Sequence, residues 1–127
     1  MENPDNQPKD PLTGAILGAA FEVANNLGHG FLENLYQRAL THELFSRGVE
    51  VEREVYFRVI YKGVDIGTYI ADMVVAKEVI VELKAMEANI SPPQISQCLN
   101  YLKASGLKKG LIINFGRSKL EFKRVVL

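Results

Sequence analysis

The sequence predicts an α/β protein whose mixed β-sheet is flanked by helices. Three observations predict this class. Apolar residues recur every three or four positions between residues 12 and 47, as in amphipathic helices. From position 49 to 85 they alternate with polar residues or run continuously, as in strands. A strong helix start then separates these strands from two later apolar runs. The predicted order is helix, helix, three strands, helix, two strands (α-α-β-β-β-α-β-β).

Two helices open the predicted fold. The first spans residues 12–27 and ends at Gly28-His29-Gly30, where His29 is expected to be exposed. The second spans about Phe31 to Arg47, with Gly48 as its stop signal. The apolar side chains of the second helix fall on one side, which is expected to be buried. They are Leu32, Leu35, Tyr36, Ala39, Leu40 and Leu44.

Three strands are predicted next. Residues 49–61 alternate apolar and charged side chains and indicate a half-exposed strand. Residues 66–76 and 79–85 are expected to pair as a hairpin centred on Lys77. The second of these contains a nearly continuous apolar run, typical of a strand that is buried on both faces.

A third helix and two strands complete the pattern. Ser91-Pro92-Pro93 combines a capping serine with proline at the first helical position, and the helix is expected to reach about Ala104. Residues 110–116 form an apolar strand expected near the centre of the sheet, and residues 120–127 indicate a last strand.

Composition indicates one soluble globular domain. The chain has 127 residues, 47% hydrophobic and 24% charged, and we expect a single domain over residues 12–127. Residues 1–11 contain three prolines and predict a flexible lead-in. No membrane span or signal peptide is evident, and Cys98 is the only cysteine, which excludes an internal disulfide and a four-cysteine cluster. A cytoplasmic location is therefore expected, with Cys98 buried rather than reactive.

The charges are unevenly distributed although the net charge is zero. Residues 1–80 hold seven Lys/Arg against twelve Asp/Glu, whereas residues 81–127 hold eight against three, a net charge of +5. Two interpretations stay open. The second part could form a basic face that meets phosphates, or its charges could belong to an ordinary solvated surface.

Asp72, Glu82 and Lys84 are the candidate reactive residues. In a hairpin centred on Lys77, Asp72 lies opposite Glu82, with Cβ atoms roughly 4.5–5.5 Å apart. Two carboxylates at this separation repel each other unless a cation lies between them or one is protonated. Lys84 shares a face with Glu82 because side chains alternate along a strand. The alternative is a solvated aspartate beside an ion pair, but the apolar strand favours a metal site.

These residues carry a family resemblance. Asp72 followed by Glu82-x-Lys84 resembles the signature of the PD-(D/E)XK nuclease superfamily, although Ala71 replaces its proline. The segment Gly30-Phe31-Leu32-Glu33-Asn34-Leu35-Tyr36 resembles the motif of its GxxExxY branch. The resemblance implies a restriction-endonuclease-like core and hydrolysis of DNA phosphodiester bonds that depends on Mg²⁺, with Mn²⁺ as a possible substitute.

The resemblance also implies roles for individual residues. Asp72, Glu82 and the carbonyl of Leu83 would bind the metal, and Lys84 would orient the attacking water. Three further roles are implied for helix residues. Lys103 is a separate candidate for contact with the substrate. Glu33 would bind metal through water, Gln97 would reach the attacking water or a phosphate, and Tyr101 would support Gln97 at the substrate.

Other functions remain open from the sequence. The absence of an evident base-reading element favours a non-catalytic module that binds nucleic acid or a protein partner. A hydrolase acting on a smaller phosphodiester is a third hypothesis. If the protein cleaves DNA, a homodimer is expected, because one small domain covers little duplex.

Overall fold

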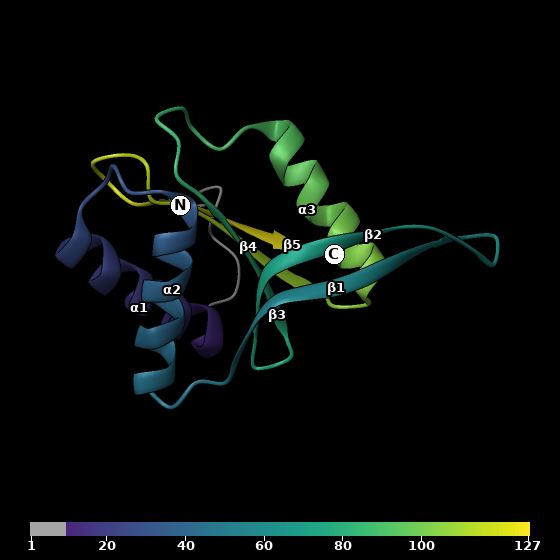
Figure 1. The fold of residues 1–127 in the computed structure, drawn as a ribbon, viewed down its shortest axis with the longest axis horizontal. Coiled ribbons are helices and arrows are strands. Elements are labelled where there is room, and N and C mark those ends of the chain that lie inside the picture. The colour runs from purple at the N-terminus through teal and green to yellow at the C-terminus, as the bar shows by residue number, and fades with distance from the viewer. Residues whose placement is uncertain (1–9) are drawn as a thin grey trace, which may run out of the picture.

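The computed structural model describes residues 10–127, so most of the predicted lead-in lies outside the described residues. The elements follow the predicted order (Figure 1). The helices are α1 (Pro11–Leu27), α2 (Glu33–Ser46) and α3 (Pro92–Ser105). The strands are β1 (Val51–Tyr61), β2 (Val64–Val75), β3 (Val79–Lys84), β4 (Lys109–Asn114) and β5 (Glu121–Val126).

The five strands form one mixed sheet in the order β1-β2-β3-β4-β5. Only β3 and β4 pair in parallel, and the other three pairs are antiparallel. The parallel pair requires a crossover, which α3 supplies. The mixed sheet with flanking helices confirms the predicted restriction-endonuclease-like α/β class, and β3 lies at its centre, buried along residues 79–83.

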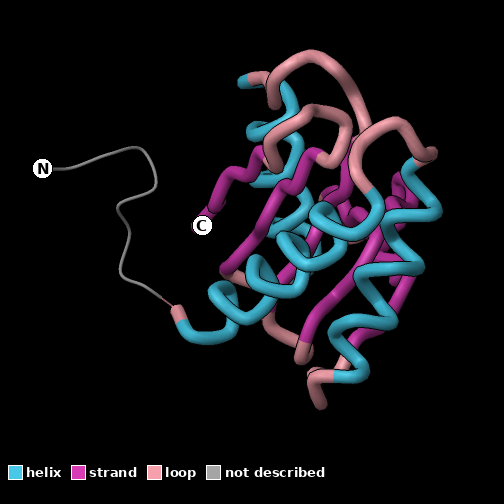
Figure 2. Tube along the Cα trace, turned by 90° about the vertical axis from the view of Figure 1, so that its left-hand side faces the viewer, coloured by secondary structure: helices cyan, strands magenta, loops and turns pink. Residues whose placement is uncertain are grey.

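Helices cover both faces of the sheet. Helices α1 and α2 lie across one face (Figure 2), and α3 lies on the other (Figure 1). The α1–α2 side contains a core cluster to which β2 and β3 contribute Met73, Val75, Val81 and Leu83. The α3 side contains a second cluster that includes Ala71, Ile80, Cys98 and Leu102. Cys98 is buried as predicted, and burial raises the pKa of its thiol to about 12.

The helix ends follow the capping chemistry of the sequence. The Asp10 carboxylate accepts a hydrogen bond from the backbone N–H of Leu12, and Pro11 occupies the start of α1. Ser91 and Gln94 form a reciprocal capping box at the start of α3. No helix within residues 10–127 is long and apolar enough to cross a membrane.

The second helix differs from the prediction at its start and on its buried side. It begins at Glu33 rather than Phe31, and Leu32 and Leu35 are 74% and 43% exposed. Tyr36 is buried as predicted, and its ring stacks on Phe115 with 4.6 Å between centroids. Its hydroxyl donates to the Gly28 carbonyl at 2.6 Å and thereby holds the preceding loop outside the helix. The prediction that Leu32 and Leu35 are buried is therefore wrong.

A change of facing direction in β1 and β2 positions the candidate site. Met73 belongs to the α1–α2 core, whereas Ala71, two residues earlier, belongs to the α3 core. Residues two apart in a regular strand face the same side, so the strand must turn at Asp72. Opposite this point, Glu54 of β1 has a positive φ of 53° and is absent from the ladder, which pairs Arg53 with Met73 and Val55 with Ala71.

Candidate active site

Asp72 and Glu82 meet where the ladder between β2 and β3 ends. The last paired residues on that side are Met73 and Val81, and one step further the carboxylates bond to the opposite strand. The backbone N–H of Asp72 donates to Glu82 Oε2 at 3.0 Å, and the backbone N–H of Leu83 donates to Asp72 Oδ2 at 2.7 Å. These crossed bonds fix both side chains at one junction.

The two carboxylates are held in an environment that disfavours their joint ionisation. Burial, reinforced by the charge of Asp72, raises the pKa of Glu82 to about 7. Burial also raises the pKa of Asp72, while the Leu83 N–H and Lys84 oppose this rise. No described residue donates a hydrogen bond to the remaining oxygens, Asp72 Oδ1 and Glu82 Oε1. The junction therefore offers two free carboxylate oxygens in a partly buried position. No described cationic side chain forms an ion pair with either carboxylate.

Glu33 and Lys84 lie near this junction. Burial and then the Asp72 charge raise the pKa of Glu33, and Lys84 and the backbone N–H of Ala85 act in the opposite direction. Lys84 also favours the charged forms of Asp72 and Glu82. Its ammonium forms no ion pair within 4 Å in the described part of the chain. The charge of Lys84 thus favours the ionised forms of Glu33, Asp72 and Glu82, although Lys84 forms an ion pair with none of them.

The predicted residues of α3 are placed differently from one another. Tyr101 is partly buried, and its pKa is raised by burial and then by the charges of Glu82 and Asp72, so it lies near the junction. Gln97 is exposed, one helical turn before Tyr101 on the same side of α3. Lys103 is exposed and, being two residues after Tyr101, points to a different side. The roles proposed for these three residues stay predictions.

An aromatic stack fixes the ring of Tyr101. Tyr101 and Tyr69 of β2 stack with centroids 3.9 Å apart, and Phe57 of β1 stacks on the other side of Tyr69 at 5.3 Å. The Tyr69 hydroxyl donates to the Tyr101 carbonyl at 2.8 Å. Burial raises the pKa of the Tyr69 hydroxyl well above its ordinary value, so the hydroxyl stays protonated and can donate. The stack ties α3 to the hairpin beside the carboxylates.

Two neighbours of Asp72 were not predicted from the sequence. Gln37 is buried and its Nε2 donates to the Asp72 carbonyl at 2.9 Å, which anchors β2 to α2. The charge of Glu54 raises the pKa of Asp72. Gln37 could have been predicted from the sequence, because it lies one helical turn after Glu33 and shares its side of the helix. No sequence pattern indicates Glu54, since its position follows from the irregular backbone of β1.

A small hollow of about 170 Å³ lies at the junction, between α2 and the strands β1, β2 and β3. Its lining combines acidic, amide and apolar side chains: Glu33, Asn34, Gln37, Glu54, Asp72 and Leu83. Asp72 and Glu33 therefore face the same space although they are 39 positions apart in the chain. Within residues 10–127, no three or more His, Cys, Asp and Glu side chains are grouped so as to hold a metal ion.

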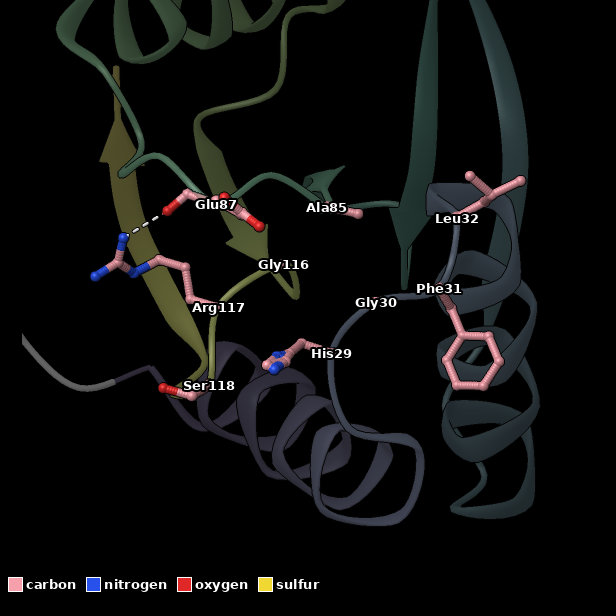
Figure 3. A pocket seen from close by; sticks show the side chains of 9 residues that line it. All are labelled: His29, Gly30, Phe31, Leu32, Ala85, Glu87, Gly116, Arg117 and Ser118. Atoms are coloured by element: carbon pink, nitrogen blue, oxygen red, sulfur yellow. Dashed lines mark hydrogen bonds between the residues drawn. The ribbon is translucent and has the colours of Figure 1, made fainter.

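A larger hollow of about 600 Å³ adjoins the junction, between the loops that follow α1, β3 and β4 (Figure 3). Leu32 and Ala85, which border it, are the chain neighbours of Glu33 and Lys84. His29, Arg117 and Ser118 contribute polar groups, and Arg117 donates to the Glu87 carbonyl at 2.6 Å (Figure 3).

The loops that follow β3 and β4 approach each other so closely that only glycine fits at position 116. A Cβ at this position would lie 2.2 Å from the backbone nitrogen of Met86. Asn114, fully buried, supports the same contact because its Oδ1 accepts from the backbone N–H groups of Met86 and Gly116.

Comparison with known proteins identifies the family of the chain. The model of the PD-(D/E)XK nuclease superfamily matches residues 10–125. No curated protein matches the sequence at a significant level. Among solved structures, the crystal structure of SSO0001 is similar with a TM-score of 0.57 and 15% identity, covering 95% of this chain and 70% of that one. That likeness concerns the fold. Because the family model spans nearly the whole chain, the protein belongs to the PD-(D/E)XK nuclease superfamily.

Proposed function

We propose that the protein is a metal-dependent nuclease that hydrolyses DNA phosphodiester bonds. The observation that carries this proposal is the junction of Asp72 and Glu82, with Lys84 close to both. Membership of a nuclease superfamily supports the reaction class, and the motif Gly30 to Tyr36 supports placement in the GxxExxY branch.

The donor set fits a hard divalent cation such as Mg²⁺ or Mn²⁺. Mg²⁺ takes oxygen ligands and is commonly bound through one or two carboxylates together with water and substrate phosphates. Asp72 and Glu82 would hold it, with the Leu83 carbonyl as a further ligand and Glu33 acting through water. When bound, the cation would supply Lewis-acid polarisation of the phosphate and stabilise the leaving oxygen.

The chain's own residues would orient and stabilise the reacting groups. Lys84 is free to orient the attacking water and to offset negative charge that develops on the phosphate. Tyr101, fixed by its stack on Tyr69, is close enough for the charges of Glu82 and Asp72 to raise its pKa, and Gln97 is one turn away on the exposed side of α3. Their expected role is to position the substrate, with Lys103 a weaker candidate because it points elsewhere.

A non-catalytic module that binds nucleic acid or a protein partner is the second candidate. It is favoured by the absence of a three-residue metal group among the described residues and by the hydrogen bonds that already engage one oxygen of each carboxylate. We favour catalysis because the buried carboxylate pair is costly without a cation, and a module that only binds would have no use for it.

The proposal is tested by calorimetric titration with Mn²⁺ and by nicking of plasmid and cleavage of single-stranded DNA. We expect Asp72→Ala to lose metal binding and to lower cleavage at least a hundredfold. Lys84→Ala should still bind metal but cleave at least a hundredfold more slowly. Asp65→Ala is the matched control, because Asp65 lies on the same strand but is exposed, and it should behave like the wild type.

Two outcomes would contradict the proposal. Wild-type protein that binds Mn²⁺ but cleaves none of the polymers would favour the non-catalytic module. Equal loss of activity in Asp65→Ala and Asp72→Ala would show that the junction has no special role.

A further inference from the structure

A third hollow lies along α2, beyond the carboxylate junction. It has a volume of about 320 Å³ and lies between the outer side of α2 and the start of β1. Its lining is rich in cationic and hydrogen-bonding side chains and contains no acidic one: Arg38, Thr41, His42, Phe45, Val51 and Arg53. We call this hollow the arginine groove.

The two arginines of this groove have no anionic partner. Neither Arg38 nor Arg53 forms an ion pair or a hydrogen bond with the described residues. The nearby arginines differ. Arg47 is paired with Glu43 at 2.7 Å and reaches Gly18 of α1, and Arg58 lies 3.8 Å from Asp65. Two guanidinium groups that line one hollow without a partner are suited to bind an anion, because their planar N–H groups match phosphate oxygens.

The arginine groove and the junction hollow share two of their lining elements, α2 and β1. Asn34 and Gln37 of α2 line the junction hollow, and Arg38 and Thr41 line the groove one helical turn further on. On β1 the adjacent residues Arg53 and Glu54 divide in the same way between the two hollows. Four helical residues span roughly 6 Å along the axis. A strand of duplex DNA presents a phosphate about every 3.4 Å along its axis, so the groove lies within one or two nucleotides of the junction.

We infer that Arg38 and Arg53 form a subsite for backbone phosphate of a nucleic acid, next to the nucleotide held at Asp72 and Glu82. This inference rests on the proposed function for its choice of polymer. The subsite would fix the register of the strand without reading its sequence, because phosphate contacts carry no sequence information. It places the contact in residues 1–80, the acidic part of the chain by composition, and not in the basic part after residue 80.

The test compares two double variants that remove the same charge. Arg38→Gln/Arg53→Gln empties the groove of its cations, and Arg47→Gln/Arg58→Gln removes two arginines that already have carboxylate partners. Binding of a fluorescently labelled DNA of 24 nucleotides, single-stranded or duplex, is measured by fluorescence anisotropy. The salt concentration is varied between 50 and 300 mM, and EDTA is present to prevent cleavage. Thermal melts check that both variants are folded.

The groove variant should bind duplex DNA about tenfold or more weakly at low salt. The slope of log affinity against log salt should fall by about 2, one for each lost phosphate contact. The control variant should keep the wild-type affinity within about threefold and the wild-type slope. Equal effects of the two variants, an unchanged slope in the groove variant, or no DNA binding by the wild type would overturn the inference.

These readouts are independent of cleavage, so the two proposals fail separately. DNA binding that depends on Arg38 and Arg53 in a protein that never cleaves would retain the subsite and reject the nuclease. Cleavage that depends on Asp72 but is indifferent to both arginines would retain the nuclease and reject the subsite.

Discussion

The two ends of β2 have similar sequences and opposite environments. Each end carries one aspartate among β-branched or other apolar residues, Asp65 near the hairpin turn and Asp72 near β3. Asp65 is exposed, accepts a hydrogen bond from Gly67 two residues away, and has Arg58 nearby at 3.8 Å. Asp72 bonds across to the next strand and faces a second carboxylate. What separates a candidate catalytic aspartate from an ordinary one is therefore its burial and its neighbours.

The two ends of β2 differ because the helices cover only one of them. The hairpin of β1 and β2 projects past α1 and α2 (Figure 1), and residues 64–68 of β2 are exposed. Residues 73–75 lie between helices on both faces and are buried. A carboxylate is disfavoured in the second environment and well solvated in the first.

The largest expected effect tests whether the two ends of β2 differ in packing. Met73→Ala should lower the free energy of unfolding by about 3 kcal/mol, because Met73 is fully buried and its loss leaves a cavity. Ile66→Ala, at a residue 60% exposed, should cost less than about 0.5 kcal/mol. Urea denaturation measures both. Similar costs would show that the site end of the strand is not held by packing.

A smaller effect tests the electrostatic side of the contrast. At pH 8 without divalent metal, Glu82→Gln should raise the free energy of unfolding by about 1–2 kcal/mol. It removes a buried charge beside Asp72 while retaining an oxygen that can accept from the Asp72 N–H. Asp65→Asn should change stability by less than about 0.5 kcal/mol, since Asp65 is solvated. Chemical denaturation in EDTA gives the comparison, and a destabilised Glu82→Gln would mean that the junction is not under electrostatic strain.

The smallest expected effect concerns a carboxylate that does have its cation. Asp10 caps α1 and contacts Lys109 at 2.9 Å, and the hydrogen bond to Lys109 lowers the pKa of Asp10. Its charged form is favoured in the folded state, so its contribution is present above the unfolded pKa of about 3.9 and is lost as the pH falls through the lower folded pKa. Asp10→Ala should cost about 1 kcal/mol at pH 7.

The measurement for Asp10 is the thermal midpoint of wild type and variant between pH 2 and 7. The difference between the two proteins should shrink at the acidic end of this range. A difference that grows as the pH falls would have the wrong sign for a carboxylate whose pKa is lowered.

Much of the fold and part of the site could be predicted from local patterns. The apolar run from Val79 to Val81 indicated a strand buried on both faces, and Ser91-Pro92-Pro93 marked the start of α3, because strand burial and helix capping depend on neighbouring residues. The hairpin register followed from counting outward from Lys77. Local patterns failed at Leu35, whose apolar character did not lead to burial, because Tyr36 and its contacts with Phe115 and Gly28 set the rotation of α2.

By itself the sequence determined that an acidic pair and a lysine would lie at the end of a buried hairpin, since alternation and register are properties of adjacent strands. Only the tertiary structure decided what surrounds them. The positive φ of Glu54, the bond from Gln37 to Asp72 and the alignment of Arg38 with Arg53 join residues from different elements. Their meeting depends on how α2 packs against β1, because no local pattern encodes a contact between segments that are distant in the chain.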